Sequence, residues 1–132
     1  MNRPLPEPTE LSRGFWEAAG RRQLVAQRCS ECRRWRHYPQ LRCPFCHSKA
    51  WNWEPLSGRG TVYTFTITHQ AFHAYWQDRV PYAVAIIELE EGIRMVSDFH
   101  TEDIELLRIG TRVEVIFEDG PEFTLPRFRI AR

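Results

Sequence analysis

The sequence predicts a mainly β protein made of an N-terminal helix, a zinc ribbon and a five-stranded barrel. Three observations support this prediction. Two Cys-x-x-Cys pairs are separated by ten residues, a spacing typical of metal-binding ribbons. Short segments that alternate apolar and polar residues follow them, as in small β barrels. Apolar residues at helical spacing precede them. A chain of 132 residues suits one domain with a small appended module.

The N-terminal part is expected to form an arm and a helix. Residues 1–8 are rich in proline and favour an extended arm. After Thr9, the segment ELSRGFWEAA carries apolar residues at helical spacing, among them Leu11 and Phe15. Gly20 is a plausible stop signal. We therefore expect a short helix that begins after Thr9.

The cysteines predict a closed metal site. A strand, Gln23–Cys29, leads into a four-cysteine unit that ends near Ser48. Zinc prefers tetrahedral thiolate coordination, and two Cys-x-x-Cys turns on adjacent hairpins supply it. Four thiolates leave no open coordination position, so the zinc should hold structure and not activate water. Loss of one cysteine should unfold the ribbon, because the free energy of metal binding contributes to the stability of the folded ribbon. The expected metal ligands are Cys29, Cys32, Cys43 and Cys46.

Other uses of four cysteines remain open at this point. A rubredoxin-type iron site has the same spacing as a zinc site. Two disulfides would require an oxidising compartment, and a redox pair would need only one Cys-x-x-Cys. His37 and His47 flank the pairs and are surplus to a four-thiolate site, so we expect them in supporting or surface positions.

The rest of the chain predicts short strands with one short helix among them. In the first long strand, Tyr63, Phe65 and Ile67 are expected to share one face. The segment AVAII is apolar on both faces and predicts a central strand. Thr101 is expected to cap a short helical turn. An OB-like barrel is favoured, with an SH3-like barrel as the alternative. The expected strands are residues 51–56, 60–69, 81–90, 93–100, 111–119 and 128–132.

Charge is divided unevenly along the chain. Between Arg21 and Lys49 there are eight basic residues and one acidic residue, whereas between Tyr82 and Phe123 there are eleven acidic and three basic residues. A basic ribbon and an OB barrel would suit nucleic-acid binding, which is the alternative function. The acidic barrel disfavours it, because a polyanion there would meet like charge.

Neither membrane insertion nor autonomous catalysis is indicated. The longest aliphatic run, Ala83–Ile87, is far shorter than the ~20 residues of a membrane span, and no signal peptide is evident, so we expect a cytoplasmic protein. No serine lies in a G-x-S-x-G motif, and no H-E-x-x-H motif occurs. We therefore expect no catalytic residue.

The chain resembles the DUF35 family over nearly its whole length. The resemblance lies in FWEAAGRRQLVAQRCSEC, YPQLRCPFCHS, WEPLSGRGTVYTFTITH, PYAVAIIELEEGIRMVSDF, IGTRVEVIF and PRFRI. It implies an N-terminal arm and helix at 1–22, a rubredoxin-like zinc ribbon at 23–50 and an OB-fold domain at 51–132. The family often has Gly after each cysteine pair, where Arg33 and His47 stand here. These departures concern local turn geometry and not the four ligands.

The resemblance also implies a role as a helper subunit. Family members act with thiolase-like or hydratase-like partners on acyl-CoA thioesters, some of them in steroid side-chain degradation. The OB domain of the family is proposed to accommodate CoA or the acyl chain, so acyl-CoA is a possible ligand.

Two surfaces are expected to serve these roles. The loop His69–Arg79 carries Phe72, Tyr75 and Trp76, which would form a partner-binding patch if exposed and would cap the barrel end if buried. Arg79 and His69 are candidate CoA contacts. A second possible partner patch is Phe15 and Trp16 in the N-terminal helix.

Overall fold

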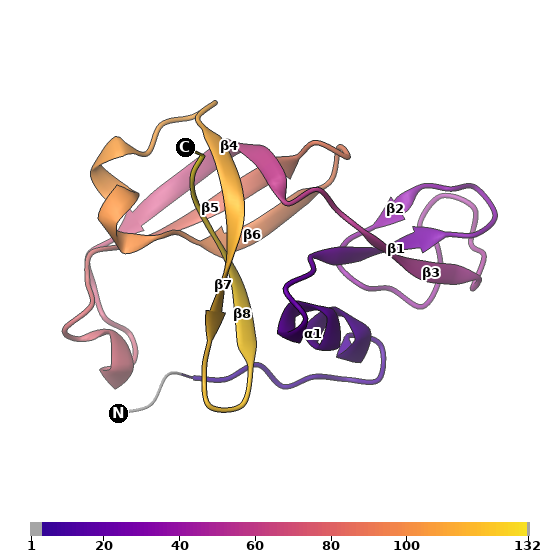
Figure 1. Cartoon of the computed structure of the whole chain (residues 1–132), viewed down its shortest axis with the longest axis horizontal. Coiled ribbons are helices and arrows are strands. Elements are labelled where there is room, and N and C mark those ends of the chain that lie inside the picture. The colour runs from indigo at the N-terminus through magenta and orange to yellow at the C-terminus, as the bar shows by residue number, and fades with distance from the viewer. Residues whose placement is uncertain (1–3, 132) are drawn as a thin grey trace.

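The structure is a computed structural model that describes residues 4–131. It contains a three-stranded ribbon sheet at one end and a five-stranded barrel at the other, with one helix beside the junction (Figure 1). The expected mainly β fold is confirmed. The elements in chain order are α1 Arg13–Gly20, β1 Val25–Cys29, β2 Trp35–Arg36, β3 Trp51–Pro55, β4 Arg59–Thr68, η1 Ala74–Trp76, β5 Tyr82–Leu89, β6 Arg94–Asp98, η2 Thr101–Leu106, β7 Arg112–Asp119 and β8 Thr124–Ile130.

The ribbon sheet has the order β2-β1-β3, with antiparallel pairing throughout. Strand β1 is central and ends at Cys29, which pairs with Trp51 on β3. The first cysteine pair starts at the last residue of β1 and continues into the turn before β2, whereas the second lies in the loop between β2 and β3. The first cysteine of the candidate metal site is therefore held by the buried central strand of the sheet.

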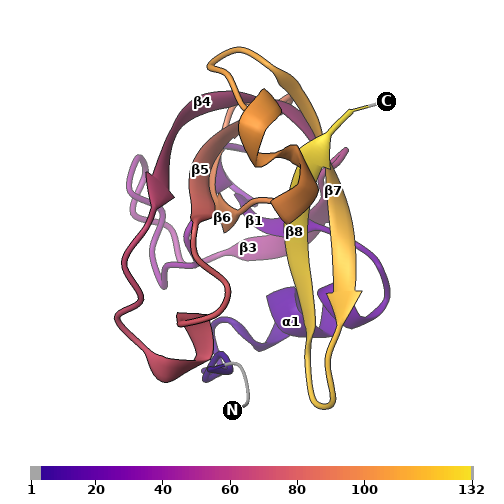
Figure 2. The same ribbon diagram turned by 90° about the vertical axis from the view of Figure 1, so that its left-hand side faces the viewer.

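The barrel sheet has the order β6-β5-β4-β7-β8, again antiparallel. A bridge between Phe99 and Phe128, together with a hydrogen bond from the N–H of His100 to the carbonyl of Phe128 at 2.9 Å, nearly closes the barrel. Its strands curve round a common interior (Figure 2). At Gly60 a Cβ would lie 2.4 Å from the carbonyl oxygen of Glu88, so glycine allows β4 to pass close to β5.

One core serves the barrel and its junction with the ribbon. Ile87, Phe99 and Phe128 are at most 2% exposed, and fully burying such a side chain contributes about 1.5–3 kcal/mol. Leu24 and Ala26, from the ribbon side, belong to the same buried cluster. The ribbon is therefore packed onto the barrel.

Polar contacts add to this junction. The guanidinium of Arg22, just after α1, pairs with the carboxylate of Asp119 at the end of β7. Both side chains are more than half exposed, so the pair contributes little free energy but orients the β7–β8 hairpin beside α1. Within residues 4–131, the structure contains no helix with the length and apolar surface that a membrane span requires.

Some local expectations were wrong. Tyr63 does not share a face with Phe65 and Ile67, because a β-bulge between Val62 and Thr64 turns Tyr63 outward and Val62 into the core. An insertion of one residue reverses the side-chain alternation, which a period of two cannot anticipate.

The two helix starts also differ from expectation. Helix α1 begins at Arg13, because Thr9 and Ser12 exchange hydrogen bonds and form a separate turn first. The cap position of η2 is His100, not Thr101. Of the expected arm, residues 1–3 lie outside the described part, and residues 4–8 have no regular secondary structure.

Candidate metal centre and partner surface

The four cysteines converge at the end of the ribbon sheet. Their sulfur atoms all lie within 4.8 Å of one another. The Sγ atoms of Cys29 and Cys46 are 3.5 Å apart, and those of Cys32 and Cys43 are 3.6 Å apart. A tetrahedral site with metal–sulfur distances of about 2.3 Å has sulfur–sulfur edges of about 3.8 Å. All four thiols are free. The cysteines are therefore positioned to bind one metal ion.

Both cysteine turns use the left-handed backbone conformation that glycine usually supplies. Arg33 has φ 65° and His47 has φ 66°. The N–H of Arg33 donates to the carbonyl of Cys29 at 3.1 Å, and the N–H of His47 donates to that of Cys43 at 2.9 Å. The two turns are therefore equivalent despite their side chains.

The surroundings of the cysteines shift the pKa values of Cys29 and Cys46 in opposite directions. Backbone N–H donation from Cys32 lowers the pKa of Cys29 to about 6. The N–H of Ser48 lowers the pKa of Cys46, but desolvation and the three other cysteines outweigh it and raise that pKa to about 11. Four thiolates at one point repel one another unless a cation lies between them. A bound metal would supply that charge.

The two flanking histidines do not join the cluster. His47 is exposed, whereas His37 is partly buried, with its Nε2 buried and lacking a hydrogen-bond partner among the described residues. Burial lowers the pKa of His37 to about 4. Its ring packs 3.9 Å from that of Tyr38 and 6.3 Å from that of Phe15. His37 thus belongs to the junction with the helix.

The aromatic residues of the loop before β5 are split between two environments. Phe72 is 79% exposed. Tyr75 and Trp76 are partly buried, with ring centroids 4.9 Å apart, and Trp76 packs 4.6 Å from Tyr82. None of Phe72, Tyr75 and Trp76 belongs to the hydrophobic core cluster. They form a surface beside the barrel, which we call the loop surface.

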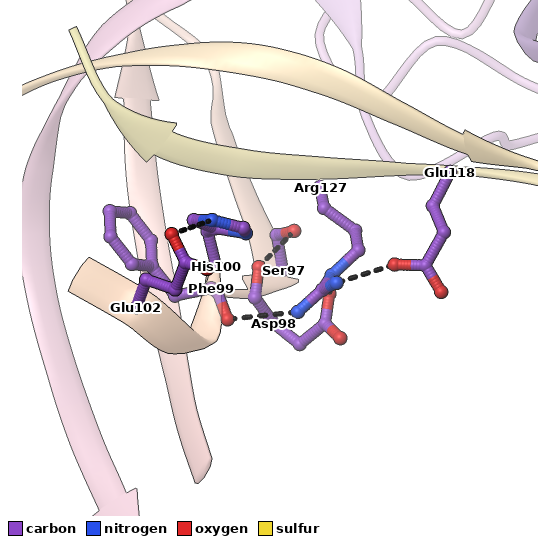
Figure 3. A network of polar contacts seen from close by, with 7 residues as sticks. All are labelled: Ser97, Asp98, Phe99, His100, Glu102, Glu118 and Arg127. Atoms are coloured by element: carbon purple, nitrogen blue, oxygen red, sulfur yellow. Dashed lines mark hydrogen bonds and ion pairs between the residues drawn. The ribbon is translucent and has the colours of Figure 1, made fainter. Parts of the chain in front are cut away.

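A groove of about 770 Å³ runs from the loop surface to η2. Arg127 crosses its wall: Nε donates to Asp98 at 3.1 Å, Nη2 donates to the carbonyl of Phe99 at 3.0 Å, and Nη1 pairs with Glu118 (Figure 3). The groove is acidic, because five carboxylates and two arginines line it. These charged residues are Asp78, Arg79, Asp98, Glu102, Glu105, Glu118 and Arg127.

Of the two candidate CoA contacts, only one lines this groove. Arg79 lines it and is already engaged: Nη1 donates to Asp78 at 2.9 Å and to the carbonyl of Tyr75 at 3.1 Å. Its guanidinium also lies 4.0 Å from the centroid of the Tyr75 ring. His69 is exposed and is not among the residues that line the groove.

A second, apolar groove of about 320 Å³ lies where α1, the ribbon and the barrel meet. Phe15 and Trp16 line it, and their rings form an edge-to-face pair at 5.1 Å. Sequence patterns did not reveal this groove, because its walls come from segments far apart in the chain. The other apolar lining residues are Tyr38, Pro39, Met95, Val96, Leu125 and Pro126.

Comparisons with known proteins assign both halves of the chain. Residues 16–52 match the family described as "ChsH2, rubredoxin-like zinc ribbon domain", and residues 53–118 match "ChsH2, C-terminal OB-fold domain". A "DUF35 domain-containing scaffold protein" of Methanocaldococcus jannaschii is 36% identical over 104 residues, which cover 75% of this chain and 73% of that protein.

The chain also resembles subunits of enzyme complexes. A "Probable enoyl-CoA hydratase alpha subunit" of Thermomonospora curvata is 38% identical over 98% of this chain, which spans only 40% of the length of that relative. A chain of the solved "Ltp2-ChsH2(DUF35) aldolase" is 36% identical with a TM-score of 0.88, covering 97% of this chain and 100% of that one. The chain therefore belongs to the DUF35 family, with the zinc ribbon and OB-fold domains of ChsH2.

Proposed function

We propose that this chain is a zinc-binding accessory subunit, without catalysis of its own, that binds an enzyme acting on acyl-CoA thioesters. The observation that carries the proposal is the likeness of the whole chain to the DUF35 chain of an aldolase, with a TM-score of 0.88. The relative described as a hydratase alpha subunit supports the same kind of complex. A thiolase-like or hydratase-like subunit is the proposed partner.

Zinc is the proposed metal, held by Cys29, Cys32, Cys43 and Cys46. Four thiolates in tetrahedral geometry suit zinc, and such a site supports structure because no position is left for substrate. Elemental analysis should find one equivalent of zinc per chain. One equivalent of iron, with the red colour of an iron–thiolate centre, would instead assign a rubredoxin-type centre.

The loop surface is the proposed partner contact, with Phe15 and Trp16 as a second contact. Partly exposed aromatic side chains that pack against one another are favourable contact residues at protein interfaces. The edge-to-face packing of Tyr75 against Trp76 and the 79% exposure of Phe72 support this assignment.

A direct contact with acyl-CoA is proposed only at Arg79 and His69. Both are exposed and could reach a CoA that the partner holds. The carboxylates of the acidic groove disfavour an independent CoA site there, because the phosphates of CoA would meet like charge. The same charge disfavours nucleic acid.

The test is reconstitution with the enzyme subunit that co-purifies from the native cell. The proposal expects a hydratase-like or thiolase-like subunit at defined stoichiometry, with acyl-CoA turnover by the complex and none by this chain alone. Turnover of a thioester by the isolated chain would overturn the accessory role. Recovery of nucleic acid instead, with binding that weakens steeply as salt rises, would favour a nucleic-acid module.

A further inference from the structure

Arg36, on strand β2, is buried inside the ribbon with 1% of its surface exposed. Its guanidinium donates to three backbone carbonyls. Nη1 donates to the carbonyl of Gln40, and Nη2 donates to those of Ser48 and Ala50, each at 3.2 Å. The Nε–H is buried and has no hydrogen-bond partner among residues 4–131. One donor of the fork therefore remains for another acceptor.

The two carbonyls that share Nη2 also hold the cysteine turns. The carbonyl of Ser48 accepts the N–H of Cys43 at 2.9 Å. The carbonyl of Ala50 accepts the N–H of Ser30, next to the first cysteine of the cluster, at 3.0 Å. A single buried side chain therefore connects the backbone segments that carry both Cys-x-x-Cys turns.

Arg36 lacks a carboxylate counter-ion in the described part of the chain. The ion pairs seen within the ribbon use Arg28 and Arg33, both with Glu54. A buried guanidinium without an opposite charge is strongly unfavourable. Because its acceptor carbonyls also hold the cysteine turns, the thiolates of the cysteine cluster are the negative charge that this buried cation adjoins.

We propose that Arg36 is a positioning residue of the metal centre, where its guanidinium is the counter-ion of the four thiolates and holds both cysteine turns at the separation that the metal needs. Four thiolates around a divalent ion carry a net charge of about −2, which offsets the buried cation. This inference rests on the metal centre of the proposed function and adds a residue outside its ligand set.

Three variants of the full chain test the inference. Arg36→Gln removes the charge, Arg36→Lys keeps the charge but loses the fork, and Lys49→Gln removes an exposed charge from the same ribbon. Each is loaded with zinc for competition against a chelator, and with Co²⁺ to record the sulfur-to-metal charge-transfer band. This band reports the electrostatic environment of the sulfurs, which a loss of packing alone would not change.

Arg36→Gln should retain metal about 10–100-fold less tightly than the parent chain, the range typical of groups that support metal ligands. Its Co²⁺ band should move to longer wavelength, because sulfur loses a stabilising positive charge. Arg36→Lys should keep the band near its original position while binding metal more weakly. Lys49→Gln should match the parent chain in both measurements.

Parent-like affinity and an unshifted band in Arg36→Gln would overturn the inference. If Arg36→Gln does not fold, Arg36→Lys decides: a folded, metal-loaded lysine variant supports the charge role, and failure of both variants assigns Arg36 to packing alone. A parent chain that binds neither zinc nor Co²⁺ would instead overturn the metal centre itself, so the two failures are distinguishable.

Discussion

The hydroxyl of Tyr38, in the ribbon, accepts a hydrogen bond from the backbone N–H of Val96, on barrel strand β6, at 2.9 Å. The bond joins residues 58 positions apart and satisfies an N–H at the edge of the barrel sheet. It also lies beside the apolar groove that Phe15 and Trp16 line. The ribbon thus supplies the acceptor for one N–H of the edge strand β6.

Tyr38→Phe should lower the free energy of unfolding by about 0.5–1 kcal/mol, because one partly exposed hydrogen bond is lost. Urea denaturation measures this difference. Tyr63→Phe is the matched control, since Tyr63 is similarly exposed and its hydroxyl makes no hydrogen bond within residues 4–131. Equal stability of the two variants would show that the Tyr38 bond contributes nothing.

His47→Gly should stabilise the zinc-loaded protein by about 0.5 kcal/mol. A left-handed residue other than glycine costs about 1–2 kcal/mol, and the greater chain entropy of glycine in the unfolded state offsets part of the gain. Gly110→Ala is the opposite control, because Gly110 has φ 87° and open space for a methyl group. It should destabilise the protein by about 1 kcal/mol, and thermal unfolding measures both changes.

His37 predicts a pH dependence of stability. Burial lowers its folded pKa to about 4, whereas the unfolded value is about 6.5. As pH falls below about 6.5, the unfolded chain binds a proton that the folded chain does not, so stability is lost on acidification. Between pH 7.5 and 5.5 the parent chain should lose about 1 kcal/mol more than His37→Phe.

The pH experiment uses urea denaturation with metal content monitored at each pH, so that loss of zinc is separated from protonation of His37. A parallel pH dependence in the two proteins would show that His37 titrates normally when folded.

The double variant Tyr75→Ala/Trp76→Ala should weaken partner binding by about tenfold or more, because truncated aromatic anchors often cost at least 1–2 kcal/mol at an interface. Pull-down with the co-purifying enzyme subunit measures the effect, and zinc content should be unchanged. Phe72→Ala should act in the same direction.

Ile109→Ala is the matched control for that surface, since Ile109 is a large apolar residue that is 70% exposed and lies outside the loop surface. It should leave partner binding unchanged. If Phe72, Tyr75 and Trp76 can be truncated without loss of binding, the apolar groove with Phe15 and Trp16 becomes the interface to test.

Sequence patterns predicted features well where these depend on residues that are close in the chain. The spacing of Cys29, Cys32, Cys43 and Cys46 was sufficient to expect one metal site, and their sulfurs meet within 4.8 Å. On β7, Val113 is buried and Phe117 packs against the core, as expected of alternate residues in a strand. The predicted orientation of Tyr63 was wrong, because the β-bulge depends on how β4 pairs with the neighbouring strands and not on the sequence of β4 alone.

Tertiary structure alone decided which distant residues meet. No local period could reveal that Arg36 would be buried beside the cysteine turns, or that Tyr38 would reach Val96. Side-chain alternation and ligand spacing depend on neighbours a few residues away, so the sequence itself determined most of the strands, the cysteine turns and the charge of each half. Strand β8 differs, because it begins at Thr124 and not at the expected residue 128. The grooves depend on contacts between distant segments, such as those of Phe15 and Leu125, and only the packing of ribbon, helix and barrel brings such segments together.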